Sequence, residues 1–197
     1  MLGERVVERR PFFPVALTVA GRDCVVIGPL DDPEVAHKSA ALEECGADVR
    51  HVVDHATLTQ RDVAGAFFVL SAIKDRALSE RLLDFSRDHR FLLWCVDQPA
   101  FSSVSMMAIA KSGPVRVATS TSGAAPAVAS ALRRAFERAM DPTFARFIDQ
   151  LAAMRLRIRE AKPGRAQARE RVDLILEASR AFDVCVAFRY PEWFEER

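Results

Sequence analysis

The sequence predicts an α/β fold that continues into a helical C-terminal half, and three observations along the 197-residue chain support this prediction. Up to about Asp97, short apolar runs alternate with segments of helical pattern, which is typical of a parallel sheet with helical crossovers. Two further short runs are joined by Ser112-Gly113-Pro114, as expected for a strand pair outside that sheet. From Pro126 onward, apolar residues recur at helical spacing.

The first strand and helix are predicted directly after Gly21. The run DCVVIG that follows Arg22 is apolar and β-branched, so it suits a strand buried on both faces. A helix should come next, because Asp32 offers an N-cap oxygen and Pro33 suits the first helical position. Cys45-Gly46 is expected to end this helix.

Three more strands and a helix complete the predicted parallel sheet. They are VRHVV at 49–53, GAFFVLSA at 65–72, a helix from about Leu78 to His89, and FLLWCV at 91–96. The carboxyl ends of parallel strands meet at one edge of the sheet, which is where open α/β folds bind ligands. The loops expected at this edge begin at Gly28, Asp54, Ser71 and Asp97.

The back half is predicted to hold a strand pair and three helices. The strands are expected within 103–113 and 115–123, and the helices within 126–140, 143–161 and 166–182. Residues 128–180 hold 12 Lys or Arg against 7 Asp or Glu. This cationic surplus indicates either the solvated face of ordinary helices or a surface for an anionic ligand.

Composition and charge exclude several classes of function. Lys and Arg total 28 against 27 Asp and Glu, so a net charge of +1 offers no basic field for nucleic acid or an anionic membrane. No apolar run approaches the roughly 18 to 20 residues that span a bilayer, and the opening MLGERVVERR lacks the apolar core of a secretory signal. We therefore expect a cytoplasmic protein with neither a nucleic-acid nor a membrane partner.

The spacing of cysteine and histidine argues against a structural metal site. The four cysteines include no CxxC pair, and Cys24 and Cys95 lie within predicted strands, so buried thiols in a reducing compartment are expected. The four histidines include no pair at metal-ligand spacing on one helix face. We therefore expect no structural metal.

Several segments, in a specific order, resemble one enzyme family. They are Phe13-Pro14-Val15-Ala16-Leu17, the run from Gly21 to Gly28, a helix from Glu34-Val35-Ala36 to Glu44-Cys45-Gly46-Ala47, and three later segments. Ser71-Ala72-Ile73-Lys74-Asp75 with Leu78 is similar to the pattern AATDD..LN, Cys95-Val96-Asp97-Gln98-Pro99 to NVVDDP, and residues 117–126 to VAISTGGxSP. Over roughly residues 12–160 the chain thus resembles the precorrin-2 dehydrogenase and sirohydrochlorin ferrochelatase family, found alone or at the front of siroheme synthases.

This resemblance implies a fold and an activity. The implied fold is a Rossmann-like NAD-binding domain at 1–112, a small dimerisation segment at 113–142 and a C-terminal helical domain at 143–197, in an intertwined homodimer. The implied activity is NAD-dependent oxidation of precorrin-2 to sirohydrochlorin in siroheme biosynthesis, often followed by insertion of ferrous iron. NAD is then the cofactor, iron is a substrate, and the other partner is a tetrapyrrole with eight carboxylates.

The resemblance also implies binding residues. For NAD they are Gly28, Glu34, Val35, Asp54, His55, Ser71 and Ala72. For the tetrapyrrole they are Ser120, Thr121, Ser122, Gly123, Arg133 and Arg134, and four further arginines carry the same chemistry: Arg138, Arg155, Arg157 and Arg159. Asp54 is equally expected as a loop acid or helix cap, and the Ser/Thr cluster as a turn before the next helix.

The loop after the first strand departs from the family. A dinucleotide site uses GxGxxG, or the family's GGG, because glycines let the backbone approach the pyrophosphate. Here Gly28 precedes Pro29-Leu30-Asp31-Asp32-Pro33, in which the prolines lack an N–H and the aspartates add negative charge. The alternative is a non-catalytic homologue that keeps the Rossmann fold as a scaffold and binds a tetrapyrrole or a partner protein. A general Rossmann oxidoreductase is a third alternative, but it leaves the pattern over 97–126 unexplained.

Asp97 is the expected catalytic residue. It follows the apolar run FLLWCV at the ligand edge and matches the aspartate that the family is thought to use for both reactions. A carboxylate there can accept a proton from the macrocycle as hydride leaves, or from a pyrrole as iron enters. Its alternative role is to start a turn before Pro99.

Overall fold

The structure is a computed structural model that describes residues 13–164, 167–180 and 182–190. The chain forms two compact units, which divide between Met107 and Ala108. The finer division at residues 112 and 142, which the sequence suggests, stays a prediction.

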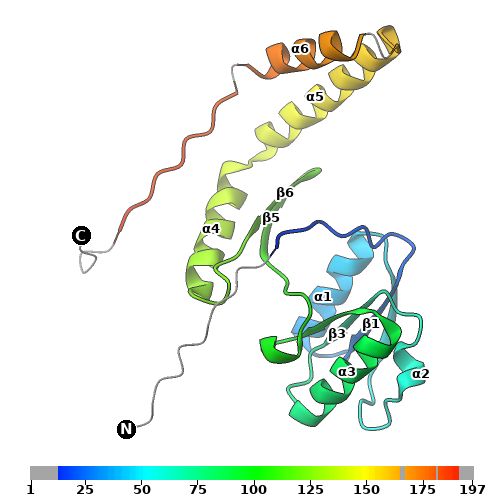
Figure 1. Cartoon of the computed structure of the whole chain (residues 1–197). Coiled ribbons are helices and arrows are strands. Elements are labelled where there is room, and N and C mark those ends of the chain that lie inside the picture. Colours follow the sequence, from blue (N-terminus) through cyan, green and yellow to red (C-terminus); the bar gives the residue numbers. More distant parts are fainter. Residues whose placement is uncertain (1–12, 165–166, 181, 191–197) are drawn as a thin grey trace. The chain divides into compact units, whose positions relative to one another are not determined.

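The first unit is built on a four-stranded parallel sheet (Figure 1). Its strands are β1 (Asp23–Ile27), β2 (Asp48–Val52), β3 (Phe68–Ser71) and β4 (Leu92–Cys95), in the spatial order β2-β1-β3-β4. All neighbouring strands are parallel, so their carboxyl ends share one edge. The predicted parallel sheet is confirmed, and its edge is where the candidate residues of this unit should be sought.

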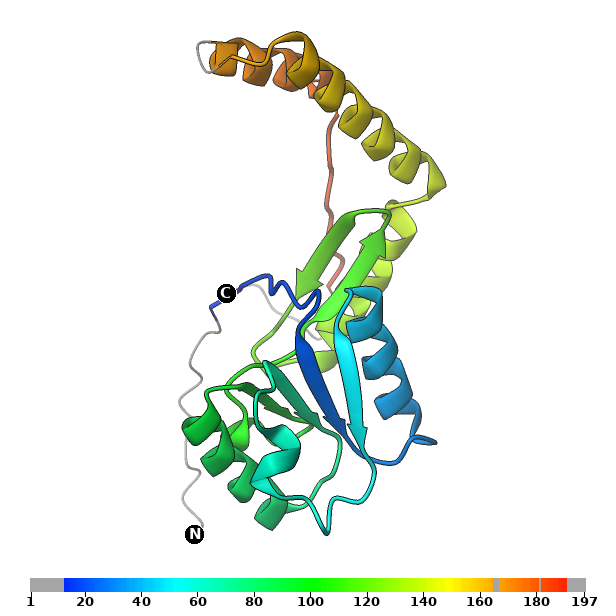
Figure 2. The same ribbon diagram turned by 90° about the vertical axis from the view of Figure 1, so that its right-hand side faces the viewer.

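Helices cover both faces of this sheet (Figure 2). They are α1 (Pro33–Glu44) and α3 (Arg76–His89), with a short α2 (Gln60–Val63) and a 3-10 turn (Pro99–Phe101) in the connections. Alternate residues of the strands enter two buried clusters, one of which includes Val35 and Leu42 of α1 while the other includes Leu78 and Leu82 of α3. The strands β1 and β3 are therefore buried on both sides, as their continuous apolar runs predict, whereas the edge strand β2 is largely exposed.

Side-chain caps fix where the two long helices begin. The Asp32 carboxylate accepts a hydrogen bond from the Glu34 N–H at 2.7 Å, and Pro33 occupies the first position of α1, as predicted. The Asp75 carboxylate caps α3 in the same way, through the Leu78 N–H at 2.7 Å. Both caps place an aspartate at the carboxyl edge of the sheet.

A bidentate ion pair joins the first two strands. Arg50 of β2 donates to both carboxylate oxygens of Asp23 on β1, at 2.8 and 2.7 Å, and also to the carbonyl of Asp62 at 3.1 Å. The hydrogen bond from Arg50 is the main reason why the pKa of Asp23 lies below its usual value. The pair lies at the amino end of β1, away from the ligand edge, and so contributes to the fold rather than to the site.

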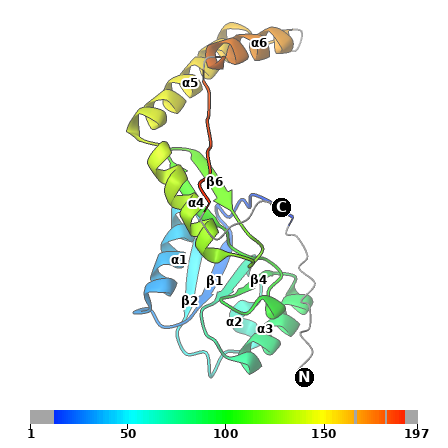
Figure 3. The ribbon, with the colours of Figure 1, turned by 90° about the vertical axis from the view of Figure 1, so that its left-hand side faces the viewer.

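The second unit pairs two antiparallel strands and continues into three helices (Figure 3). They are β5 (Ala108–Ser112), β6 (Val115–Thr119), α4 (Pro126–Ala139), α5 (Pro142–Ala161) and α6 (Ala168–Ser179). The predicted strands at 103–113 and 115–123 were too long. Ser103 instead exchanges hydrogen bonds with Leu93 of β4, and residues 120–123 form a turn.

Aromatic and arginine contacts hold α5 against α6 and against the residues after it. Arg171 donates to the carbonyls of Lys162 and Gly164, at 2.5 and 2.7 Å, which closes the connection between the helices. Phe182 then packs on α5, with ring centroids 6.0 Å from Phe144 and 5.2 Å from Phe147. Residues 182–190 are exposed and have neither helical nor strand structure, although this end of the chain was expected to be helical as far as Phe182.

The cysteines divide into two classes. Cys24 and Cys95 are buried in β1 and β4, as predicted, and burial raises the pKa of both thiols. Cys45 and Cys185 are exposed, so the expectation of buried thiols was wrong for these two. Among the described residues, none of the helices is long and apolar enough to cross a membrane.

We predict that the protein is an obligate dimer, because the second unit buries little of its own apolar surface. Its buried hydrophobic residues, within the described ranges, are Ala110 and Ala129, whereas Leu156, Leu174 and Leu176 are exposed. A two-stranded sheet is marginal alone. Sedimentation at micromolar concentration should show a dimer, and a folded monomer there would contradict this prediction.

We predict that Asp23→Asn lowers stability at neutral pH by about 0.5–1 kcal/mol, a modest value because this ion pair is partly exposed. The folded-state pKa of Asp23 is lowered, so its contribution is present above the unfolded-state pKa of about 4 and is lost as pH falls through the folded value. Thermal unfolding of variant and parent should therefore converge at low pH. Asp48→Asn, at the same end of β2, is the matched control and should show little effect.

Candidate functional site

The carboxyl edge of the sheet gathers the candidate residues of the first unit. Backbone hydrogen bonds run from Gly28 N to Val52 O (3.1 Å), from Ala72 N to Ile27 O (2.9 Å) and from Val96 N to Ser71 O (2.9 Å). These bonds tie together the four strand ends. The loops that start at Gly28, Ala72 and Asp97 therefore lie side by side.

Gly28 lets the first loop approach its neighbours closely. It is buried and has a φ of +153°, and a Cβ built on it would lie 2.8 Å from Val35 Cγ2 and 3.4 Å from Ala72 Cβ. No other residue fits at this position without displacing the start of α1. The structure thus brings together three residues predicted for the cofactor: Gly28, Val35 and Ala72.

The N-terminus of α1 is acidic. The Asp32 carboxylate already holds the Glu34 N–H, and Pro29 and Pro33 have none to offer. Asp31 and Glu34 are exposed beside it. The helix end, which in dinucleotide-binding folds receives the pyrophosphate, is here occupied by a carboxylate of the chain itself.

Asp97 lies on the neighbouring loop and binds Lys74. Its Oδ2 is 2.5 Å from Lys74 Nζ, and the two side chains are 68% and 63% exposed. The pKa of Lys74 is raised, chiefly by the hydrogen bond to Asp97 and its charge, and further by the charges of Glu34 and Asp32. The amide of Gln98 donates to the carbonyl of Ile73 at 3.1 Å, which fixes this loop to the one that carries Lys74.

The backbone at Asp97 is left-handed, with a φ of +57°. Among residues with side chains, aspartate and asparagine tolerate this conformation best. The 3-10 turn that follows has Gln98, not Asp97, at its cap position. Asp97 itself lies in the turn that the Gln98 N–H closes by donating to the Cys95 carbonyl at 3.1 Å. Its backbone thus serves this turn while its carboxylate binds Lys74, and a catalytic function of the carboxylate stays a prediction.

Ser71 supplies a buried hydroxyl without a partner in the described part of the chain. It is fully buried at the last paired position of β3, beside Ile27 and Cys95. A buried hydroxyl of this kind normally finds a hydrogen-bond partner. Together with the close approach at Gly28, this hydroxyl fits an edge that receives a dinucleotide, whereas the acidic start of α1 does not fit the pyrophosphate unless a cation offsets its charge.

Asp54 and His55 lie on the loop after β2. The two carboxylate oxygens of Asp54 accept from the Ala56 N–H and the Thr57 hydroxyl, each at 3.1 Å. His55 is half-buried. The Asp54 carboxylate thus stabilises its own turn, which is the alternative expected for a loop acid, and its contact with a cofactor stays a prediction.

The residues predicted for the tetrapyrrole all belong to the second unit. The hydroxyls of Ser120 and Thr121 accept from the N–H groups of Ser122 and Ala125, each at 3.1 Å, and so close the turn before α4. Ser122 and Gly123 have left-handed φ values of +51° and +78°. On α4, Arg133 pairs with Glu137 at 2.6 Å and Arg134 is exposed.

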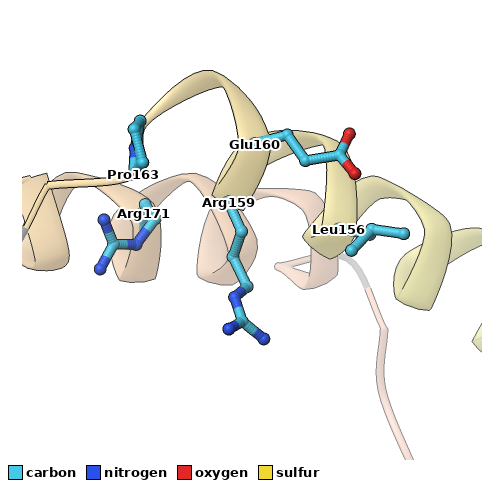
Figure 4. Close-up of a pocket in the computed structure, with 5 residues that line it drawn as sticks. All are labelled: Leu156, Arg159, Glu160, Pro163 and Arg171. Carbon is cyan, nitrogen blue, oxygen red and sulfur yellow. The ribbon is translucent and has the colours of Figure 1, made fainter.

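A hollow lies at the connection between α5 and α6 (Figure 4). It is lined by Leu156, Arg159, Glu160, Pro163 and Arg171. Arg159 belongs to the arginines expected to suit carboxylates, but Arg171 is committed to the carbonyls of the α5–α6 connection. No cluster of three or more His, Cys, Asp or Glu that suits a metal ion occurs among the described residues.

Lys74 is the site residue that the sequence analysis did not single out. Its ion pair joins residues 23 positions apart, so no local pattern announces it. One signal was available, because Lys74 stands where the pattern AATDD of the resembling family has an aspartate. At Lys74 the chain therefore has a positive charge where the family pattern has a negative one, whereas the loop after Gly28 has the two aspartates Asp31 and Asp32.

Comparisons with known proteins agree with this geometry. A family model described as putative NAD(P)-binding matches residues 15–108. The siroheme synthase of Nitrosococcus oceani is 24% identical over 188 residues, which cover 86% of this chain and 40% of that protein. The precorrin-2 dehydrogenase of Bacillus subtilis is 28% identical over 135 residues, which cover 68% of this chain and 78% of that protein.

A solved structure shares the fold. SirC, a precorrin-2 dehydrogenase, superimposes with a TM-score of 0.68 at 17% sequence identity, over 84% of this chain and 88% of that chain. This match confirms the predicted fold class. The chain spans only 35–40% of the length of the first siroheme synthases that it matches.

We predict that replacing Asp31 and Asp32 with glycine tightens NAD binding by about tenfold, because repulsion is removed and the loop is freed. Calorimetric titration with NAD measures the change. The variant with asparagine at both positions removes the charge but keeps the helix cap, so it separates repulsion from loop freedom. Unchanged or weaker binding in both variants would mean that these carboxylates do not face the pyrophosphate.

Proposed function

We propose that the chain is a member of the precorrin-2 dehydrogenase family and that it oxidises precorrin-2 to sirohydrochlorin with NAD as the cofactor. The observation that carries this proposal is the exposed carboxylate of Asp97 at the ligand edge of the same parallel sheet that carries the Gly28 turn. We place the reaction in the cytoplasm, as a step of siroheme biosynthesis.

Gly28, Val35, Ser71 and Ala72 would hold the cofactor at the sheet edge. Gly28 gives the close backbone approach, and the Ser71 hydroxyl is a buried donor and acceptor in need of a partner. When bound, NAD supplies an acceptor for the hydride that leaves the macrocycle. This assignment rests on the close backbone approach at Gly28 and on the Ser71 hydroxyl. It does not rest on the start of α1, because the carboxylates there repel phosphate.

Asp97 would act as the general base. Oxidation of the macrocycle releases a hydride and a proton, and a carboxylate at the site can accept the proton. Lys74 binds Oδ2 of this carboxylate, which leaves Oδ1 to face the substrate. The same carboxylate can accept pyrrole protons in a second reaction, in which ferrous iron enters as substrate.

The second unit would bind the carboxylates of the tetrapyrrole. Arg134, the Ser122 hydroxyl and the N–H of Gly123 in the left-handed turn offer the required donors. The hydroxyls of Ser120 and Thr121 shape this turn. We propose that the protein acts as a homodimer, with residues 113–142 as its dimerisation segment.

We predict that Asp97→Asn lowers turnover of precorrin-2 by about 10²- to 10⁴-fold, the usual effect of a positioned proton acceptor. Asparagine suits the left-handed backbone, so fold and tetrapyrrole binding should persist. Melting temperature and steady-state rate are measured on the same preparation.

The matched control is Asp75→Ala, which removes the cap of α3 at the same edge. It should lower stability by about 0.5–2 kcal/mol while turnover stays near the parental rate. An Asp97→Asn variant that behaves like this control would remove Asp97 from the mechanism. Parental protein that binds tetrapyrrole without turnover would instead support the non-catalytic homologue.

A further inference from the structure

The start of α1 lacks the positive potential that a pyrophosphate needs. The Asp32 carboxylate takes the Glu34 N–H, the two prolines have no N–H, and Asp31 and Glu34 add further negative charge. A dinucleotide at this edge must therefore find a cation on a neighbouring side chain. The loop after β3 offers one.

Lys74 lies close to both the Gly28 turn and Asp97. The two residues before it border that turn, since a Cβ on Gly28 would lie 3.4 Å from Ala72 Cβ and 4.0 Å from Ile73 Cδ1. The Lys74 ammonium binds Asp97, and the charges of Asp32 and Glu34 add to the effect of Asp97 in raising its pKa. Lys74 therefore stays cationic and lies within electrostatic reach of the helix start.

The ion pair between Lys74 and Asp97 can exchange partners easily. Both side chains are mostly exposed, and exposed ion pairs contribute little because water competes for both partners. A diphosphate carries more charge than a single carboxylate and offers several acceptor oxygens, so it competes well for an ammonium group.

We propose that Lys74 is a ligand for the pyrophosphate of the dinucleotide and that it leaves Asp97 to bind it. This inference rests on the proposed function, because it takes the dinucleotide to be the cofactor at this edge. When Lys74 moves to the phosphates, both oxygens of Asp97 become available to accept a proton. Cofactor binding then frees Oδ2 of the base, which Lys74 holds in the absence of cofactor.

Calorimetric titration with NAD and NADP tests this proposal on the whole 197-residue chain. Lys74→Met should weaken binding about tenfold, the effect of losing one charge-assisted contact. Lys74→Arg should retain most of the affinity, because it keeps the charge. Raising the salt concentration should weaken binding less in Lys74→Met than in the parent, since fewer charges are then screened.

Arg76→Met is the matched control. Arg76 lies two residues further on, is 82% exposed and pairs with Glu80 on its own helix. Its replacement removes one positive charge from the same segment and should leave affinity within about twofold of the parent. Melting curves of all variants establish that they are folded.

Asp97→Asn tests the exchange itself. If Lys74 must leave Asp97 to bind phosphate, removing this competitor should tighten NAD binding about two- to fivefold. The gain should vanish in the Lys74→Met background, because no ammonium is then released. A gain of the same size in both backgrounds would show that Asp97 acts through its own charge, and would overturn the exchange.

The results separate this inference from the proposed function. If the parent binds NAD and oxidises precorrin-2 but Lys74→Met binds as tightly as the parent, Lys74 is not a phosphate ligand and the function stands. If the parent binds neither NAD nor NADP, both fail. If the parent binds NAD but does not oxidise precorrin-2, while Lys74→Met binds more weakly, the ligand assignment stands and the function fails.

Discussion

The absence of a side chain at residue 28 is the constraint on which the ligand edge depends. The end of β1 must reach within van der Waals distance of Val35 on α1 and of Ala72 after β3, and only glycine permits this approach. The contact fixes the start of α1 against the sheet. Since the loops that carry Lys74 and Asp97 are tied to the same strands, the geometry of the whole edge follows from it.

The negative charge at this edge is only partly offset by a side-chain cation. The start of α1 carries three carboxylates, and the loop after β3 brings one ammonium group toward them and toward Asp97. A dinucleotide-binding fold with intact glycines relies on backbone N–H groups for anion binding. Here the chain has a side-chain cation at the edge, which reconciles a loop that repels phosphate with the match to an NAD(P)-binding family.

Much of the first unit could be predicted from local patterns. Asp32-Pro33 marked the start of α1 because capping and proline geometry act within a few residues, and the β-branched runs marked β1 and β3 because both faces are buried. Tertiary contacts escaped the same reasoning. Ser103 binds β4 instead of extending β5, and Lys74 meets Asp97 across 23 residues, so neither contact leaves a periodic signal.

Prediction of the candidate site from the sequence also fails where a tertiary contact decides the role of a residue. Gly28 and Asp97 could be placed at the ligand edge from the sequence because Gly28 directly follows β1 and Asp97 comes two residues after the end of β4. The sequence left the role of Asp54 open, and the structure adds that this carboxylate closes its own turn. Such a choice between a local and a distant partner depends on side-chain direction, which composition and spacing do not specify.

The unequal cores of the two units have a consequence for the order of folding. The first unit contains both buried hydrophobic clusters and is synthesised before the second unit. It can therefore fold while the second unit is still being synthesised on the ribosome. The second unit covers little more than Ala110 and Ala129 within the described residues. In the proposed dimer its helices gain burial only when two chains meet, so maturation should include a slow phase whose rate rises with protein concentration.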